Sequence, residues 1–128
     1  MATRVRIVFE EAEISAILDA SSTAQAVVDS LPLSAQLSTW GEEIYFTVPV
    51  LVGEAPEARQ DMAVGELGYW PVGAAFCIFF GPTPASEGPT PRAYSNVNPF
   101  GRLEGRPSEW LAVLRSVRDG DTVRVEPA

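Results

Sequence analysis

The chain has 128 residues, 46% of them apolar, and a formal net charge of −8 at pH 7. Its nine basic residues are all arginine, and neither lysine nor histidine occurs. This composition excludes imidazole acid–base catalysis, histidine-containing triads and lysine Schiff bases. The negative charge disfavours nucleic acid and anionic membranes as partners, and the length fits one domain spanning residues 1–128.

The first third of the chain predicts a hairpin, a helix and a strand. Apolar residues alternate with polar ones over residues 5–9 and 12–18, on either side of a turn at Glu10-Glu11. Ser22, followed three residues later by Gln25, matches a capping box for a helix with apolar residues at 24, 27, 28 and 31. Pro32 ends that helix, and residues 33–39 alternate again.

The middle of the chain predicts the core. Residues 44–52 form a β-branched and aromatic strand interrupted by Pro49, and residues 54–61 form a polar loop. Two apolar strands, Leu67–Trp70 and Ala75–Phe80, follow with only Pro71-Val72-Gly73 between them, which predicts an antiparallel hairpin. Cys77 lies in this hairpin, and we expect it to be a small buried side chain rather than a reactive thiol.

The last third predicts a loop, a strand, a helix and a final strand. Four prolines between Pro82 and Pro91 indicate an ordered surface loop, and a strand region covers residues 94–103. Ser108 can cap a short helix with apolar residues at 110, 111, 114 and 117, and Asp119-Gly120 turns into a strand at residues 122–126.

These elements predict a mainly β fold with seven or eight short strands and two helices. Antiparallel strands at close spacing favour a closed eight-stranded β-barrel, which leaves no strand edge exposed, with one short helix capping each open end. The single cysteine and the lack of histidine lead us to expect no metal site and no cofactor. No signal sequence or membrane-length apolar run is visible, so we expect a cytoplasmic protein.

Aromatic residues occur in adjacent pairs on the predicted strands, and neighbours on a strand face opposite sides of the sheet. One member of each pair must therefore point out of the barrel, where the outer members form an apolar patch. Helices, loops or a second subunit can cover such a patch, or it can be a ligand groove. Trp70 is the main candidate for a groove residue. The pairs are Tyr45-Phe46, Tyr69-Trp70 and Phe79-Phe80.

Three short segments and their order along the chain resemble one known family. Gly65-Glu66-Leu67-Gly68-Tyr69, Phe76 to Phe80 and Phe100-Gly101-Arg102-Leu103 are similar to the Gly-x-Leu-x-Met, Gln-Phe-Phe-Ile and Phe-Gly-Lys/Arg-Val strands of cyclophilins. An early hairpin followed by a helix that starts near Thr23-Ala24 also fits. The chain is most similar to the small cyclophilin-like proteins of bacteria and archaea, whose function is uncharacterised. The resemblance covers most of the chain and implies a cyclophilin-type barrel.

The resemblance fails at the catalytic strand. Cyclophilins that isomerise prolyl bonds carry a Phe-His-Arg motif, whose arginine donates toward the proline nitrogen and weakens the double-bond character of the amide. The best-placed segment here, Tyr45-Phe46-Thr47-Val48-Pro49, contains neither histidine nor arginine. An isomerase of this type would need Arg59, Arg92 or Arg102 to reach the site from another element.

We therefore expect a non-catalytic or atypical family member that binds a small molecule or an extended, proline-containing peptide in an aromatic groove. The alternative is an atypical peptidyl-prolyl cis-trans isomerase, and a third reading makes the aromatic surface a homodimer interface. No catalytic residue is assigned. The expected ligand-binding residues are Trp70, Tyr45, Phe79, Trp40, Glu42 and Arg102.

Several of these residues have a second interpretation. Glu42, Glu43 and Glu66 can each serve as solvated structural carboxylates rather than as ligand contacts. Arg102 can be a surface residue paired with Glu104. The proline-rich loop can be a rigid connector or a lid beside the groove.

Overall fold

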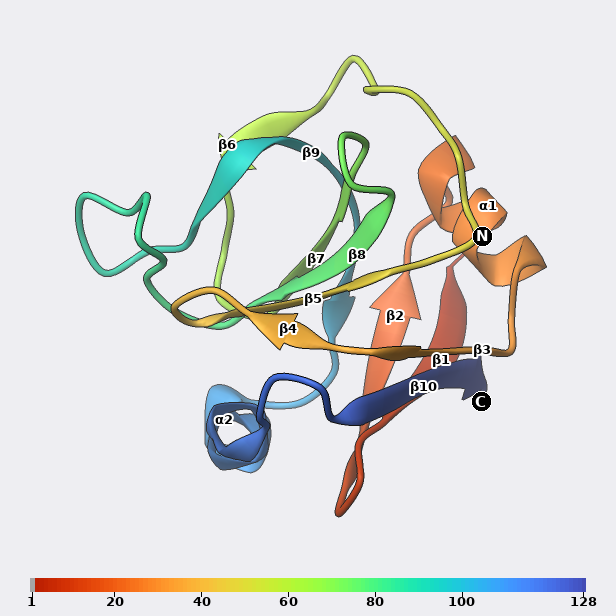
Figure 1. Cartoon of the computed structure of the whole chain (residues 1–128). Helices are drawn as coiled ribbons and strands as arrows, with labels where there is room; N and C mark the ends of the chain where they lie inside the picture. Colours follow the sequence, from red (N-terminus) through yellow and green to blue (C-terminus); the bar gives the residue numbers. More distant parts are fainter. Residues whose placement is uncertain (1) are drawn as a thin grey trace.

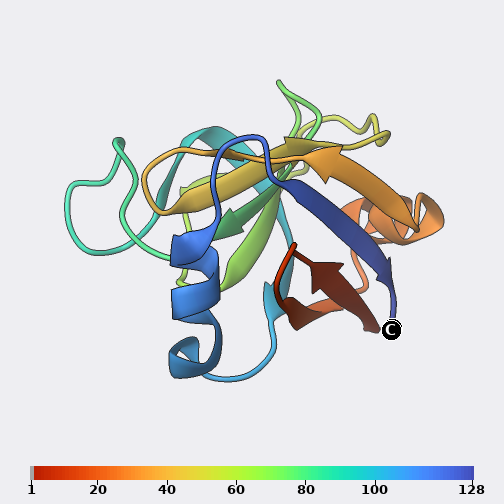
Figure 2. The same ribbon diagram turned by 60° about the horizontal axis from the view of Figure 1, so that its bottom comes forward.

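The computed structural model describes residues 2–128 and contains ten strands and two helices over that range. Figures 1 and 2 show a strongly curled sheet with the two helices at opposite ends. The elements in chain order are β1 (Thr3–Val8), β2 (Glu13–Leu18), α1 (Ser22–Asp29), β3 (Leu33–Gln36), β4 (Ser38–Thr39), β5 (Glu43–Thr47), β6 (Arg59–Asp61), β7 (Glu66–Trp70), β8 (Ala75–Phe79), β9 (Arg92–Leu103), α2 (Pro107–Ser116) and β10 (Thr122–Pro127).

The sheet is open, so the predicted closed eight-stranded barrel is wrong. Its hydrogen-bonded path runs β3-β10-β1-β2-β9-β7-β8-β5-β4, and β6 pairs with β9 off this path. The two ends of the path, β3 and β4, are consecutive in the chain and separated only by Leu37. One segment therefore pairs with β10 through its first half and with β5 through its second half, while β3 and β4 are not paired with each other and the path stays open.

Two predicted hairpins, β1–β2 and β7–β8, are confirmed. β1 pairs with β2 in register from Thr3 opposite Leu18 to Val8 opposite Glu13. β7 pairs with β8, with Trp70 opposite Ala75. The turn between β7 and β8 has four residues instead of the three that the sequence predicted. The additional residue is Ala74, whose φ is positive at 48°.

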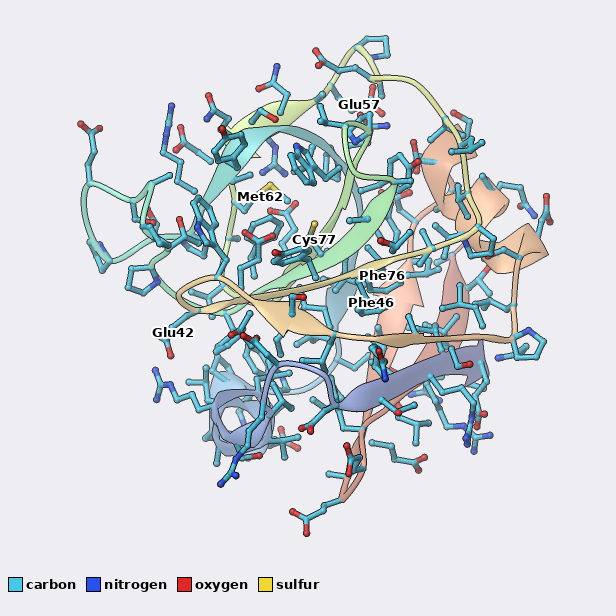
Figure 3. The ribbon with its side chains drawn as sticks, in the orientation of Figure 1. Glu42, Phe46, Glu57, Met62, Phe76 and Cys77 are labelled. Carbon is cyan, nitrogen blue, oxygen red and sulfur yellow. The ribbon has the colours of Figure 1, made fainter. Side chains whose placement is uncertain are left out.

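The main core lies on the inner face of the curled sheet. Strand alternation sends Phe46, Phe76 and Phe100 to this face, where Phe76 stacks on Phe46 at a centroid distance of 4.8 Å. Figure 3 labels Phe46 and Phe76, which lie opposite each other on the paired strands β5 and β8. Both helices add buried side chains to the same core, Val27 from α1 and Leu114 from α2 among them.

The two helices start one or two residues earlier than the sequence predicted. The N-cap of α1 is Ser21, which has an extended backbone and accepts a hydrogen bond from the Ala24 N–H at 3.1 Å. The N-cap of α2 is Arg106, whose N–H donates to Glu109 Oε1 at 2.9 Å, with Pro107 in the first turn. In the part of the chain from residue 2 onward, neither helix is long and apolar enough to cross a membrane.

β9 takes part in two layers of the molecule. Its second half pairs with β7 in the main sheet, and its first half pairs with β6, which the sequence had placed in a loop. In this way β6 and β9 cover part of the outer face of β7 and β8. A second, smaller core is enclosed there, and its buried members are Met62, Ala75, Cys77, Phe79, Ala93 and Val97.

Gly68 allows this second layer to approach the sheet. A Cβ atom at Gly68 would lie 2.7 Å from Val97 Cγ2 and 3.1 Å from Met62 Cε, closer than side chains normally pack. The register of β7 against β9 also shifts between Leu67 and Gly68. Figure 3 shows the sulfur atoms of Met62 and Cys77 between β6 and β8, in the space that this close approach encloses.

We predict that Gly68→Ala destabilises the protein by about 1–3 kcal/mol, because the added methyl group overpacks the contact with Val97. Urea unfolding measures the change. Gly53→Ala is the matched control, since no atom lies within 4 Å of the Cβ position there and the substitution should be neutral or stabilising. Equal unfolding free energies for the two variants would contradict the close-packing argument.

Candidate ligand-binding site

The outer members of the three aromatic pairs cluster as predicted. Tyr45 and Trp70 pack against the second core, and Phe79 lies within it, while their sequence neighbours point into the main core. β6 and β9 cover Phe79 completely but leave Tyr45 and Trp70 partly exposed. Elements of this chain therefore cover one portion of the patch, and a pocket remains at the edge of that cover.

The pocket, which we name the aromatic pocket, has a volume of about 140 Å³. It is formed where the start of β5, the end of β7, β8 and the first half of β9 meet. Tyr94 is the most exposed of the lining side chains at 71% and lies at the rim. The lining residues are Trp40, Glu43, Tyr45, Trp70, Cys77, Ala93, Tyr94 and Val97.

The two tryptophans of the pocket are held by specific contacts. Trp70 Nε1 donates to Ser95 Oγ at 2.7 Å, and the Trp70 ring packs directly over Gly73, where a Cβ would lie 2.6 Å from ring carbons. Trp40 precedes a turn in which its N–H donates to the Glu43 carbonyl at 2.9 Å. These contacts hold the Trp70 ring and the backbone at Trp40 in place before any ligand arrives.

The proline-rich loop supports the turn that carries Trp40 and does not line the pocket. The Pro82 carbonyl accepts the Glu42 N–H at 3.0 Å, and Gly41 has a positive φ of 60° with Pro84 packed against it. Thr83 is buried, and its hydroxyl donates to the Arg92 carbonyl. The loop is an anchored connector, and none of its residues from 82 to 91 faces the pocket.

Tyr94 stands between the two tryptophans. Its ring centroid is 6.0 Å from that of Trp40 and 6.0 Å from that of Trp70, with interplanar angles of 72° and 78°. The three rings thus meet edge to face rather than stacked. They form adjacent walls of the pocket in a nearly perpendicular arrangement.

Glu43 is the charged side chain of the pocket. It is 6% exposed, and its Oε1 atom is buried without a hydrogen-bond partner. Burial raises the pKa of Glu43 from its ordinary value to about 7, and contact with the Cys77 thiol offsets a small part of that rise. Near neutral pH the carboxyl group is therefore poised between its protonated and charged forms.

Cys77 is unreactive in this setting. Its thiol is buried and donates to the Ala75 carbonyl at 3.8 Å. Burial, and next the negative charge of Glu43, raise the pKa of the Cys77 thiol well above its usual range, so the thiolate does not form near neutral pH. The expectation of a buried thiol is confirmed, although this one also lines the pocket.

The structure brings together three of the six residues expected to bind ligand. Trp40, Tyr45 and Trp70 line the aromatic pocket, whereas Phe79 is fully buried beneath it. Glu42 points away toward α2, as Figure 3 shows, and forms an ion pair with Arg115 at 2.7 Å.

Arg102 lies in a different hollow of about 990 Å³, together with Arg59, Glu66 and Trp110. The prediction that Arg102 pairs with Glu104 is wrong. Glu104 instead forms an ion pair with Arg4 of β1, with 2.7 Å between Arg4 Nε and Glu104 Oε1.

The sequence interpretation favoured a solvated structural role for Glu43 and did not consider Tyr94 as a site residue. Strand alternation carried a signal for Glu43, since it shares the outward face of β5 with Tyr45, two residues later. Tyr94 carried no comparable signal, because its position depends on the bend of β9 over the sheet.

The three arginines named for an isomerase site lie outside the aromatic pocket. Arg59 forms an ion pair with Glu66, and Arg92 with Asp61 at 2.8 Å. No arginine lines the aromatic pocket within residues 2–128. Over the same residues, no three His, Cys, Asp or Glu side chains converge in a way that could hold a metal ion.

Comparison with known proteins agrees with the fold. A family model described as cyclophilin-like matches residues 3–126, and this chain therefore belongs to the cyclophilin-like family. The solution structure of a hypothetical protein from Archaeoglobus fulgidus is similar to it, with a TM-score of 0.79 and 37% sequence identity. The match covers 98% of this chain and 95% of that one. No curated protein matches the chain. The family resemblance expected from the sequence is confirmed.

Glu43 makes stability depend on pH, and the direction follows from its raised pKa. From pH 4.5 to about 7 the unfolded chain has released this proton and the folded chain retains it. The free energy of unfolding therefore falls as pH rises through this window and levels off above it. The total loss attributable to Glu43 is about 3 kcal/mol.

We predict that Glu43→Gln removes this loss. The unsubstituted protein should lose about 3 kcal/mol of unfolding free energy between pH 4 and pH 8, and the variant should not show this loss. Urea unfolding of both proteins at both pH values measures the difference. The control is Glu13→Gln, which alters an exposed carboxylate at the first residue of β2 and should change by less than about 0.5 kcal/mol. A stability difference that is independent of pH for Glu43→Gln would show that its carboxyl is not the titrating group.

Proposed function

We propose that this protein binds a small, ring-sized ligand in the aromatic pocket and does not catalyse prolyl isomerisation. The observation that carries the proposal is the combination of two tryptophans that line one pocket with a buried carboxyl group that lacks a partner on one oxygen. A buried polar atom without a hydrogen bond costs free energy, and such costs are characteristic of sites completed by a ligand.

The size of the pocket supports a small ligand or one side chain over an extended peptide. A cavity of about 150 Å³ in another protein accommodates benzene, which is close to the volume here. An extended peptide needs a row of such subsites along a groove. The other large hollow, around Arg102 and Trp110, is separate from this pocket and shares none of its lining residues.

The isomerase alternative has less support. It requires a hydrogen-bond donor directed at the proline nitrogen, and the three arginines proposed for this role do not line the aromatic pocket. The one acidic donor available there is the Glu43 carboxyl in its protonated form, which is a far weaker donor than a guanidinium cation.

Binding can be tested by nuclear magnetic resonance, using the three indole N–H groups as reporters. We predict that neutral ring-sized probes such as cyclohexanol, benzyl alcohol and N-acetylpyrrolidine shift the Trp40 and Trp70 signals and leave Trp110 in place. Trp110 is buried in α2 and serves as an internal reference. Trp70→Leu removes one wall and should weaken binding by about tenfold or more.

Val72→Ala is the matched control, because Val72 is exposed in the turn that follows Trp70 and lies outside the pocket. Its affinity for the probes should equal that of the unsubstituted protein. If no probe shifts the Trp40 and Trp70 signals, or if Trp70→Leu binds as before, the pocket is not a binding site. A protease-coupled assay at pH 6 and pH 8 should give no isomerisation above the uncatalysed rate, and a clear rate would favour the isomerase instead.

A further inference from the structure

We propose that the ligand of the aromatic pocket carries a methylated ammonium group, held against Trp40, Trp70 and Tyr94 with Glu43 as its counter-charge. This inference rests on the proposed function and specifies the chemical class of the ligand. It requires three properties of the pocket: aromatic walls, a lone acidic group, and a shortage of hydrogen-bond acceptors.

The aromatic walls suit a cation. A cation within about 6 Å of an aromatic ring centroid is attracted by the negative face of the ring, and tryptophan gives the strongest attraction. Here one tyrosine stands 6.0 Å from each of two tryptophans at steep interplanar angles, so the rings surround a corner rather than stacking on one another. Tyr45 contributes a fourth aromatic side chain to the lining.

The pocket contains one acidic group, and no basic side chain lines it within residues 2–128. Glu43 is its sole ionisable carboxylate, and the neighbouring acid Glu42 is already paired with Arg115 outside the pocket. Because no arginine lines the pocket within residues 2–128, the proton on Glu43 is what keeps the empty site neutral. A bound cation replaces that proton as the partner of the carboxylate. The net charge of −8 attracts cations from a distance and repels anionic ligands.

Hydrogen bonding distinguishes a methylated ammonium from a primary one. A primary ammonium has three N–H donors, and each needs an acceptor when it leaves water. The lining is mostly aromatic and aliphatic, with the Glu43 carboxyl as its buried acceptor. Methyl groups remove those donors and spread the charge over a weakly hydrated surface that packs against rings. A space of about 140 Å³ suits a group of about five or six heavy atoms, which is the size of a trimethylammonium head.

The test compares choline with 3,3-dimethyl-1-butanol, in which a carbon atom replaces the charged nitrogen and the shape is retained. We expect choline to shift the Trp40 and Trp70 indole signals and to bind the unsubstituted protein at least tenfold more tightly than the neutral isostere. The affinity for choline should rise with pH through about 7, as Glu43 loses its proton, while that for the isostere stays constant.

Variants of two glutamates separate the local carboxylate from the overall charge. Glu43→Gln should weaken choline binding about tenfold and leave the neutral isostere unaffected. Glu57→Gln removes the same charge from an exposed loop residue and should bind choline like the unsubstituted protein. The Trp110 signal reports whether each variant is folded.

The outcomes distinguish this inference from the proposed function. Equal binding of choline and its isostere, or binding of the isostere alone, overturns the cation assignment and leaves a neutral ring-sized ligand in place. Binding of neither overturns the cation assignment, and the neutral probes described above then decide separately whether the pocket binds ligands at all. Equal loss of choline binding in Glu43→Gln and Glu57→Gln also overturns it, because the effect would then come from net charge.

Discussion

The close approach of β9 and β6 to the backbone of β7 at Gly68 determines how this molecule is built outside its main core. With no Cβ at that position, Val97 and Met62 pack directly on the outer face of the sheet. That packing encloses the second core, which includes Cys77 and Phe79, on a face that the curled sheet would otherwise expose. β6 and β9 do not extend over the start of β5 and the end of β7, and the aromatic pocket lies there.

The environment of Glu43 differs from that of several other glutamates in the chain. Glu42, Glu66 and Glu104 each meet an arginine, whereas Glu43 is enclosed by aromatic rings and a thiol. An apolar side chain at this position would avoid the cost of burying a carboxyl group, so the fold does not need the acid. Destabilising ionisable groups at the edge of a pocket are common at functional sites, so the burial of Glu43 supports the proposed binding role of the pocket.

Local patterns in the sequence predicted most strands and the inward or outward direction of their side chains. Period-two alternation correctly separated Tyr45 from Phe46 and Trp70 from Tyr69, because each choice depends only on neighbours in one strand. The open sheet, β6 and the position of Tyr94 could not be obtained in this way. They depend on where Leu37 changes partners and on how β9 bends, which are contacts between segments distant in the sequence.

The strand that the family resemblance marks as catalytic occupies a central place in the candidate site, but with different chemistry. In isomerising cyclophilins this strand supplies a cationic donor, while here the outward residues of β5 are Glu43 and Tyr45. An arginine and a buried glutamate have opposite charge, so they favour opposite partners. A cation donor stabilises electron density at a proline nitrogen, and an acid among aromatic rings stabilises a positive ligand. A shared scaffold therefore does not by itself carry over a reaction, because the side chains of the site determine which chemistry a pocket can support.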